Sequence, residues 1–292
     1  MYGFGMNEMQ TDKIHHYTDI NTLALILKYR TIRFNRLDRV DDITEGEAFS
    51  QLKLEKFFFV SCWTHDLNES LPQWNMYTRD MAGVRITLPK KMFDYRPLVV
   101  PNNIKNAFQQ GTMISPIPFE DIFGDKYFIP PIFLNEDHFG REVKYDKEFI
   151  KKKNQAIKFE ISPKGEITGQ ISDPTGIATL KSPDWEFQRE YRFVLLIFPS
   201  LPASIDDYFF EQFYKKIPDI IATSLYKGKG PELDYFDVRL SQTVIDNMEI
   251  TTGPLCTEGD YLTVEALLEK YSKYGSINKS KFEGTIRRPF RK

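Results

Sequence analysis

The stretch that most constrains the fold is WEFQREYRFVLLIF, at residues 185–198. Its second half, VLLIF, is uniformly apolar, as is typical of a central strand that is buried on both faces. Alternate residues of a strand point to opposite faces, so Gln188, Glu190 and Arg192 are predicted to share one face. The strand is therefore expected to run from a polar cleft into the core of a sheet.

The carboxylate at the start of this strand has two explanations. A charged group is costly to bury unless it is solvated, paired or used. Glu190 could pair with Arg192 or Arg189 as an exposed ion pair of little energetic weight. It could instead belong to a binding or catalytic site, and the residues alone leave both explanations open.

A second informative stretch lies near the start of the chain, where HHYT precedes an amphipathic run. One of His15 and His16 is expected to face the core and the other the solvent. An inward histidine is more often a hydrogen-bonded structural residue than a catalyst. The pattern predicts a strand over 13–17, a helix over 20–29 and a strand over 31–35.

The rest of the chain mixes short strands and helices, which indicates an α+β fold. Further strands are expected within 52–63 and at 82–89, 142–146 and 217–226. Further helices are expected at 72–80, 146–160 and 260–275, with a capped helix beginning in 228–242. Loops are expected at 38–47 and 161–176, and a loop-rich insert at about 95–140. Asp41, Asp42 and Glu45 are expected to form a solvated acidic turn or to cap the next helix.

Composition excludes several classes of protein. The 39 Lys and Arg residues nearly balance 41 Asp and Glu residues, so the whole molecule is not a polycation. No run approaches the ~20 apolar residues of a membrane span, and the first ten residues do not resemble a signal peptide. With only two cysteines, a reducing cytoplasm is the expected location. Local basic segments occur at Lys151–Lys153 and in the tail at 276–292.

Common nucleotide and hydrolase motifs are not found. The chain has neither a dinucleotide-binding glycine fingerprint in a strand-to-helix context nor a P-loop. It also has no G-x-S-x-G elbow. Cys62 and His65 have Cys-x-x-His spacing, but no second ligand pair of credible spacing follows, so no metal site is predicted.

Taken in order, several short motifs resemble a large bacterial domain family of unassigned function. The resemblance covers about residues 14–198. Its landmarks are His16-Tyr17-Thr18, the strand segment Thr31–Asn35, DDITE at 41–45, SCW at 61–63, Trp74 with Tyr77, AGVRI at 82–86, VKY at 143–145, and Lys181 followed by W-x-x-x-x-E-Y-R at 185–192. That family in turn resembles the ADP-ribosyltransferase fold. The resemblance implies a split β-sheet core with flanking helices. The length of the chain suits one large domain, residues 1–275.

The resemblance also implies NAD as substrate and assigns roles to individual residues. His16 would bind the NAD ribose, and Glu190 would stabilise the oxocarbenium-like transition state. Gln188 replaces a second glutamate that is frequent in this fold, and it would position an acceptor other than arginine. The remaining NAD-binding residues would be Tyr17, Thr18, Trp74, Tyr77 and Arg192. Trp74 and Tyr77 share a helix face if 72–80 is helical, although most such aromatic pairs belong to a core.

The function implied is transfer of ADP-ribose from NAD to a macromolecule, by an intracellular toxin or anti-phage defence effector. RNA is favoured as acceptor over protein because of the basic tail and lysine run. Such an effector would need a neutralising antitoxin. Two alternatives remain: a non-catalytic module of the same fold that senses a nucleotide or a phage protein, and an NAD glycohydrolase.

Overall fold

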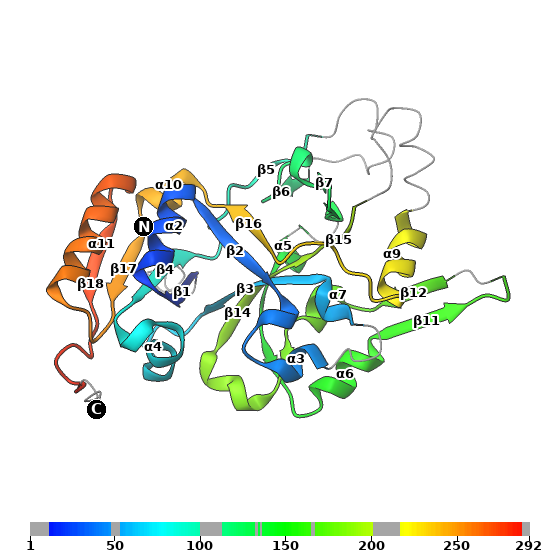
Figure 1. Cartoon of the computed structure of the whole chain (residues 1–292), viewed down its shortest axis with the longest axis horizontal. Coiled ribbons are helices and arrows are strands. Elements are labelled where there is room, and N and C mark those ends of the chain that lie inside the picture. Colours follow the sequence, from blue (N-terminus) through cyan, green and yellow to red (C-terminus); the bar gives the residue numbers. More distant parts are fainter. Residues whose placement is uncertain are drawn as a thin grey trace, which may run out of the picture.

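Strand β14 (Glu190–Leu196) lies at the centre of the structure, which is a computed structural model (Figure 1). The structure describes residues 12–47, 53–99, 113–131, 134, 136–164, 167–200 and 217–287. β14 pairs antiparallel with β3 (Phe58–Thr64) along one edge and with β9 (Gly140–Glu142) along the other. Residues Phe193 to Leu196 are buried, so the predicted central strand is confirmed.

One nine-stranded mixed sheet organises the fold, and helices flank it, which confirms the α+β class. Its main path runs through β16 (Tyr235–Arg239), β2 (Thr31–Arg36), β3, β1 (Lys13–Thr18), β4 (Val84–Pro89), β17 (Glu249–Thr252) and β18 (Ser276–Lys279). β14 and β9 branch from β3. All pairs are antiparallel except β17 with β18.

The sheet splits where β1 and β2 meet the same edge of β3. β2 pairs with the first half of β3, at Phe59 and Val60. β1 pairs with its end, where His15 lies opposite Thr64. Between these contacts neither strand pairs with β3, so the β3 edge is open around Cys62. This open edge is the feature that positions the site.

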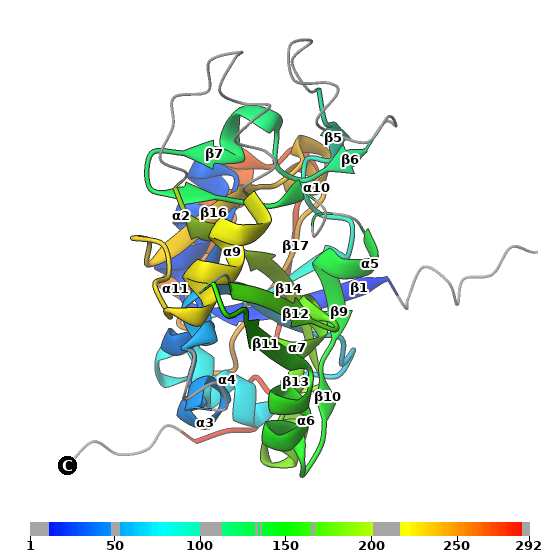
Figure 2. The ribbon, with the colours of Figure 1, turned by 90° about the vertical axis from the view of Figure 1, so that its right-hand side faces the viewer.

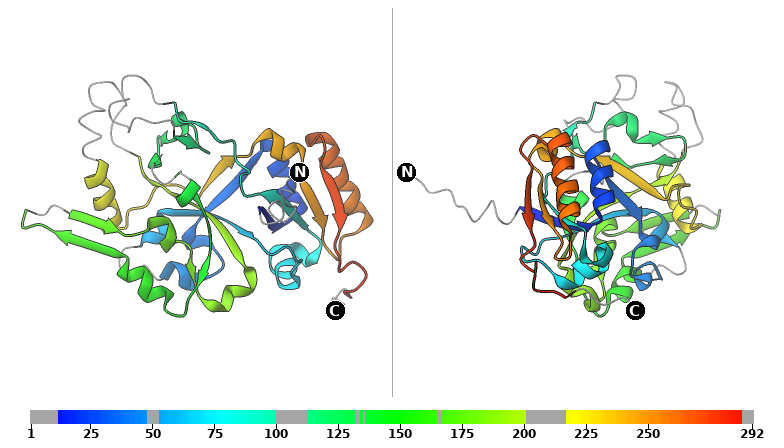
Figure 3. Two further views of the ribbon diagram at one scale, coloured as in Figure 1. Left: turned by 180° about the vertical axis from the view of Figure 1, so that it is seen from behind. Right: turned by 60° about the vertical axis from the view of Figure 1, so that its left-hand side comes forward.

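Helices α2 (Ile20–Tyr29) and α11 (Glu258–Tyr271) lie side by side over one face of the β1 half of the sheet (Figure 3). α2 connects β1 to β2 and buries Leu23, Ile26 and Leu27, as its apolar spacing predicts. Asp19 takes the N-cap position of α2 without a side-chain cap bond. Thr257 and Asp260 form a capping box that fixes the start of α11.

Short helices complete the surroundings of β14 and β3. α4 (Leu71–Tyr77) begins at the Ser70 cap with Pro72 in its first turn, as expected. The other short helices are α3 (Ile43–Glu47), α5 (Glu136–Phe139), α7 (Pro174–Ile177) and α10 (Gln242–Asp246). The 3₁₀ helices are η1 (Leu37–Arg39), η2 (Leu54–Lys56), η3 (Arg79–Met81), η5 (Phe119–Asp121) and η7 (Pro183–Gln188).

The prediction of a strand at 217–226 is wrong, because these residues form helix α9 (Ile217–Tyr226). An apolar run of this length does not distinguish a buried strand from a helix. The buried residues are Ile217, Ala222 and Leu225, which form one face of the helix. α9 packs on β12 (Ile167–Ile171), as Figure 2 shows.

The prediction of a loop at 161–176 is also wrong, because β12 pairs with β11 (Ile157–Ile161). The two strands form a hairpin that projects from the sheet (Figure 1). The preceding helix α6 (Phe149–Gln155) is therefore shorter than expected. Lys151 and Lys152 are exposed on α6, but Lys153 is fully buried. The surface-exposed run is thus two lysines and not three.

In the region 228–242, β16 precedes the expected helix, which begins only at α10 after the Ser241 cap. The predicted strand at 142–146 is divided between β9 and β10 (Lys144–Tyr145), and β10 pairs with β13 (Leu180–Lys181). Residues 276–279 of the expected tail belong to the sheet as β18.

The expected insert at 95–140 contains short strands in its described part. They are β5 (Arg96–Pro97), β6 (Ile114–Ser115), β7 (Phe123–Gly124) and β8 (Tyr127–Phe128), and β8 pairs with β15 (Phe198–Pro199). Residues 100–112 lie outside the described residues, as does the basic end 288–292. No helix in the described ranges combines the length and the apolar character needed to span a bilayer.

Candidate functional site

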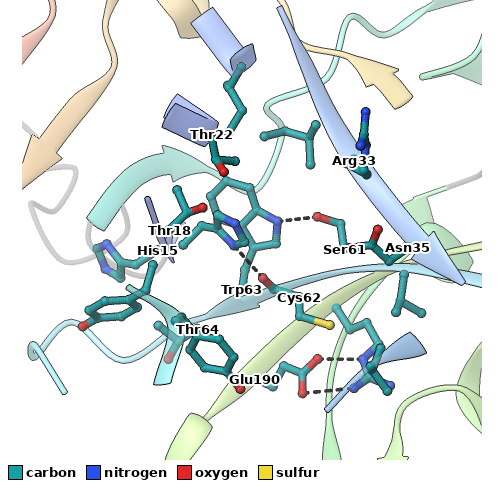
Figure 4. A pocket seen from close by; sticks show the side chains of 18 of the residues that line it. His15, Thr18, Thr22, Arg33, Asn35, Ser61, Cys62, Trp63, Thr64 and Glu190 are labelled. Atoms are coloured by element: carbon teal, nitrogen blue, oxygen red, sulfur yellow. Dashed lines mark hydrogen bonds and ion pairs between the residues drawn. The ribbon is translucent and has the colours of Figure 1, made fainter. Parts of the chain in front are cut away.

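A pocket of about 580 Å³ opens at the split in the sheet. Its walls come from β1, α2, β2, β3 and β14, so segments far apart in the sequence meet there (Figure 4). Seven of the eight predicted site residues line it: His16, Tyr17, Thr18, Tyr77, Gln188, Glu190 and Arg192. Trp74 is not among the lining residues.

The pocket reaches both faces of the sheet through the open β3 edge. Residues directly opposite each other on paired strands point to the same face. Glu190, Thr64 and His15 therefore share one face, which we call the carboxylate face. His16 and Trp63 lie on the other, the indole face, and their rings are 5.1 Å apart. A ligand that contacts both His16 and Glu190 must lie across the edge at Cys62.

His16 is held at this edge by the main chain of β3. Its Nδ1 lies 3.0 Å from the carbonyl oxygen of Cys62, which can only accept, so Nδ1 carries the proton. Burial lowers the pKa of His16, and the ring is neutral. Nε2 of a neutral ring with a protonated Nδ1 is a hydrogen-bond acceptor.

The backbone of Cys62 also faces the split. In an antiparallel strand the N–H and C=O of one residue point to the same side. The Cys62 carbonyl points to His16 and away from β14, so its N–H points into the split as well. The edge therefore offers a ligand one backbone donor beside one imidazole acceptor.

His15 lies on the carboxylate face, where its Nδ1 is 2.8 Å from the Thr87 hydroxyl. Burial, with the charges of Arg85 and Lys13, lowers the pKa of His15 to about 3. The expectation that one histidine faces the core is confirmed by His15, which is 4% exposed, while His16 is partly exposed in the wall of the pocket.

Glu190 is paired on the carboxylate face. Its Oε1 accepts from Nε of Arg192 at 2.7 Å, and its Oε2 from Nη2 at 3.1 Å. Nζ of Lys181 donates to Oε2 at 3.2 Å. The Glu190–Arg192 ion pair is thus confirmed as a contact, but it is buried and not exposed, with Glu190 only 3% accessible.

A second carboxylate completes this cluster. Arg192 is fully buried and binds both oxygens of Glu45 through its two terminal nitrogens. Lys181 Nζ lies 3.9 Å from Glu45. We call Glu45, Lys181, Glu190 and Arg192 the charge cluster, and its two negative and two positive charges balance. The expectation of a solvated turn is wrong for Glu45, which is fully buried. Asp42 accepts from the backbone N–H of Thr44 in the first turn of α3, as the alternative expectation of a helix cap predicts.

The charge cluster fixes the protonation of Glu190. Burial alone would raise the pKa of Glu190, but the charges of Arg192 and Lys181 outweigh it and lower this pKa to about 2. The Cys62 thiol also donates a hydrogen bond to Glu190. Burial and the Glu190 charge raise the pKa of Cys62 far above its usual value, so the thiol stays protonated.

Gln188 contacts the charge cluster, but not from strand β14, where it was predicted to lie. It ends η7 and does not belong to β14, because Arg189 takes a left-handed conformation (φ 42°) between them. Its Oε1 accepts from Lys181 at 2.8 Å, and its Nε2 donates to the hydroxyl of Tyr77. Arg189 itself points away and lies 3.6 Å from Asp66.

Trp74 and Tyr77 have different surroundings, although both belong to α4. The Trp74 ring is fully buried, packs edge-on against Tyr17 at 4.8 Å and donates from Nε1 to Glu69 at 3.0 Å. Trp74 therefore belongs to the core, as is usual for such aromatic pairs, and its ring does not line the pocket. Tyr77 lines the pocket and hydrogen-bonds Asp41, and burial raises its pKa far above the usual value.

Several lining residues were not singled out as site residues from the sequence. Trp63 lies at the pocket centre and donates from Nε1 to Ser61 at 3.0 Å (Figure 4). SCW and Lys181 did stand out as landmarks of the resemblance. Arg33, Asn35 and Asp41 lie in landmark segments too, at 31–35 and 41–45, but no role in the site was predicted for them, and Thr22 carried no such signal.

Comparisons with known proteins add no assignment. No family model matches the chain, and neither a curated protein nor a solved structure matches it. Among the described residues, no group of three or more His, Cys, Asp or Glu side chains is arranged to hold a metal ion.

Proposed function

We propose that this protein transfers ADP-ribose from NAD to a macromolecule, with RNA the first candidate acceptor and protein the second. The observation that carries the proposal is the convergence of His16 and Glu190 on one pocket at the split β3 edge. A volume of about 580 Å³ lies within the roughly 300–1,000 Å³ of small-molecule sites. The Trp63 indole, the Cys62 N–H and the His16 acceptor suit an aromatic amide joined to a sugar.

The chemistry requires a negative charge beside the ribose. When the bond between C1′ and the nicotinamide nitrogen breaks, its electron pair stays on that nitrogen and nicotinamide leaves as a neutral molecule. Positive charge then develops on the sugar, and an ionised carboxylate nearby stabilises it. Glu190 is ionised at every physiological pH, because Arg192 and Lys181 hold its pKa near 2.

Glu190 must also have room for a ribose hydroxyl. A carboxylate has about four acceptor positions. Arg192 takes two and Lys181 takes one, and the Cys62 thiol lies beside the carboxylate and lowers its pKa further. A thiol is a weak donor, so a ribose hydroxyl that enters at the open edge can replace it.

The acceptor side of the proposal rests on two arginines in the pocket wall and two lysines on the surface of α6. Arg33 and Arg39 line the pocket and pair with Asp237 and Asp234, and the exposed Lys151 and Lys152 pair with Glu148 and Asp146. These cations favour a polyanion such as RNA, whose binding should weaken steeply with salt. An effector that modifies RNA in the cytoplasm would require a neutralising partner protein.

A second candidate is a non-catalytic module of the same shape that binds a nucleotide. The specific observation in its favour is the charge cluster, in which Arg192 and Lys181 already compensate Glu190. A purely structural ion-pair network would look the same. This candidate predicts that the pocket binds NAD without cleaving it.

Labelled NAD tests both candidates. The purified chain is incubated with NAD labelled in its adenylate phosphate, together with separate pools of bacterial RNA, DNA and protein. Label on one pool, with release of nicotinamide, supports the transferase and names its acceptor class. Nicotinamide release without label on any pool indicates a glycohydrolase, and NAD binding without release favours the binding module.

Glu190→Gln is the variant for this assay, because it keeps the shape of the side chain. It leaves a buried cation uncompensated, so circular dichroism must show that it is folded. His16→Ala removes an acceptor without touching the charge cluster, and it is expected to weaken NAD binding. A folded Glu190→Gln protein with undiminished nicotinamide release would contradict the proposal.

A further inference from the structure

Three carboxylates line the pocket, and they differ in their partners. Asp237 is bound by two nitrogens of Arg33, at 2.9 and 3.1 Å. Glu190 is bound by Arg192 and Lys181. Asp41 has no cationic partner within the described part of the chain, and it hydrogen-bonds the Tyr77 hydroxyl. Asp41 is therefore the lining carboxylate whose charge is not compensated by an ion pair.

Local structure fixes the position of Asp41 at the mouth of the pocket. The neighbouring Asp42 is buried and accepts from both the backbone N–H and the hydroxyl of Thr44, in the first turn of α3. This turn leaves the Asp41 side chain exposed on the pocket side. The three acidic residues of this segment therefore differ in their surroundings. Asp41 faces the pocket, Asp42 binds Thr44, and Glu45 belongs to the charge cluster.

Tyr77 links Asp41 to the reaction centre. Its hydroxyl accepts from Gln188, and Gln188 accepts from Lys181, which also binds Glu190. Because the phenol stays protonated, it donates its own proton to the Asp41 carboxylate. Hydrogen bonds therefore join Tyr77 to Glu190 through Gln188 and Lys181, and Asp41 lines the same pocket beside the Tyr77 phenol.

We infer that Asp41 is the general base that activates the acceptor, an inference that rests on the proposed transferase function. As the C1′–nicotinamide bond breaks, an oxygen or nitrogen of the acceptor forms a bond to C1′. The proton that this atom loses passes to the Asp41 carboxylate and then to water. Tyr77 is a positioning residue in this step, and Gln188 supports it.

Glu190 cannot fill this role. It is 3% exposed, so an atom of a macromolecule cannot reach it, and its pKa near 2 makes it a weak base. Asp41 is exposed at the mouth, where an RNA or protein acceptor can approach. The two steps of the reaction are thus divided between two carboxylates, one buried and one at the surface.

The test compares two rates in the same reaction. The full chain is incubated with labelled NAD and whichever pool of RNA or protein accepts label from the wild type, and transfer and nicotinamide release are both followed. Asp41→Asn is expected to lower transfer by roughly 100-fold, within the usual contribution of a general base. The Kd for NAD is expected to change little, and nicotinamide release is expected to fall less than transfer, because water can take the ADP-ribosyl group in place of the acceptor. Asp219→Asn, an exposed aspartate on α9, is the matched control.

Tyr77→Phe provides a second variant that keeps the carboxylate but removes the group that orients it. It is expected to lower transfer less than Asp41→Asn does, again without changing the Kd for NAD. Unchanged transfer by Asp41→Asn overturns the inference, and so does an equal loss of transfer and NAD affinity. If the wild-type protein binds NAD but releases no nicotinamide, the proposed function and the inference are both overturned. If the wild type transfers ADP-ribose and Asp41→Asn transfers it equally well, only the inference is overturned.

Discussion

Replacing Glu45 with glutamine is expected to destabilise the fold by about 3–5 kcal/mol, the usual cost of removing one partner from a buried ion pair. Glu45 is fully buried, and both of its oxygens bind Arg192. With a neutral amide at this position, Glu190 alone faces Arg192 and Lys181, so one buried positive charge is uncompensated. The amide also turns an N–H donor toward a guanidinium that has no acceptor to offer.

The matched control is Glu249→Gln, the same chemical change in an exposed ion pair. Glu249 lies 2.5 Å from Lys13, and their side chains are 42% and 43% exposed. Exposed pairs contribute only about 0.2–1 kcal/mol, because water and salt screen them. The two variants therefore differ in burial and not in chemistry.

The assay is urea unfolding followed by tryptophan fluorescence, since Trp63 and Trp74 are buried next to β1 and β3. A lower midpoint with an unchanged m-value reports a loss of stability. Glu45→Gln combined with Arg192→Met is expected to cost less than the sum of the single variants, by about 0.5–3 kcal/mol. The reasoning is refuted if Glu45→Gln unfolds within about 1 kcal/mol of the wild type, as an exposed pair would.

Three further predictions concern single residues. His15→Gln should remove a loss of stability as the pH falls from about 6.5 toward 3, because the folded imidazole stays neutral (pKa about 3) while the unfolded one is protonated; urea midpoints across that pH range test this. Trp74→Phe should cost about 1–3 kcal/mol yet leave NAD turnover per folded molecule unchanged, since the ring contacts Tyr17 and Glu69 and not the pocket. Gly83→Ala should lower the melting temperature, because its Cβ would lie 2.3 Å from the Thr18 carbonyl oxygen.

Local patterns were sufficient to predict much of the fold around the site. The β1, α2 and β2 segments follow from alternation and helical spacing over short windows, and the apolar run in β14 identifies the central strand. The helix α9 could not be distinguished from a strand, because an apolar run gives no period by itself. The β11–β12 hairpin has polar residues on most of its exposed surface, so it resembles a loop in the sequence.

The charges of the site were harder to predict than its location. His16, Gln188, Glu190 and Arg192 line one pocket. Glu45, however, is 147 residues from Arg192 in the sequence, and nothing in the acidic segment around it indicates burial. The different roles of Asp41 and Glu45 depend on which long-range partner each one meets. A sequence reports the charge of a residue but not this partner.

The charge cluster bears on how Glu190 can act. Four buried charges are seldom more stabilising than a well-packed apolar group of the same size. Their value here lies in geometry and protonation, because a carboxylate held by Arg192 and Lys181 stays ionised and cannot rotate toward solvent. What remains variable is the weak bond from the Cys62 thiol, which lies at the open β3 edge. The Cys62 thiol is a weaker partner of Glu190 than either cation, so under the proposed function a ribose hydroxyl that enters at the split would replace it most readily.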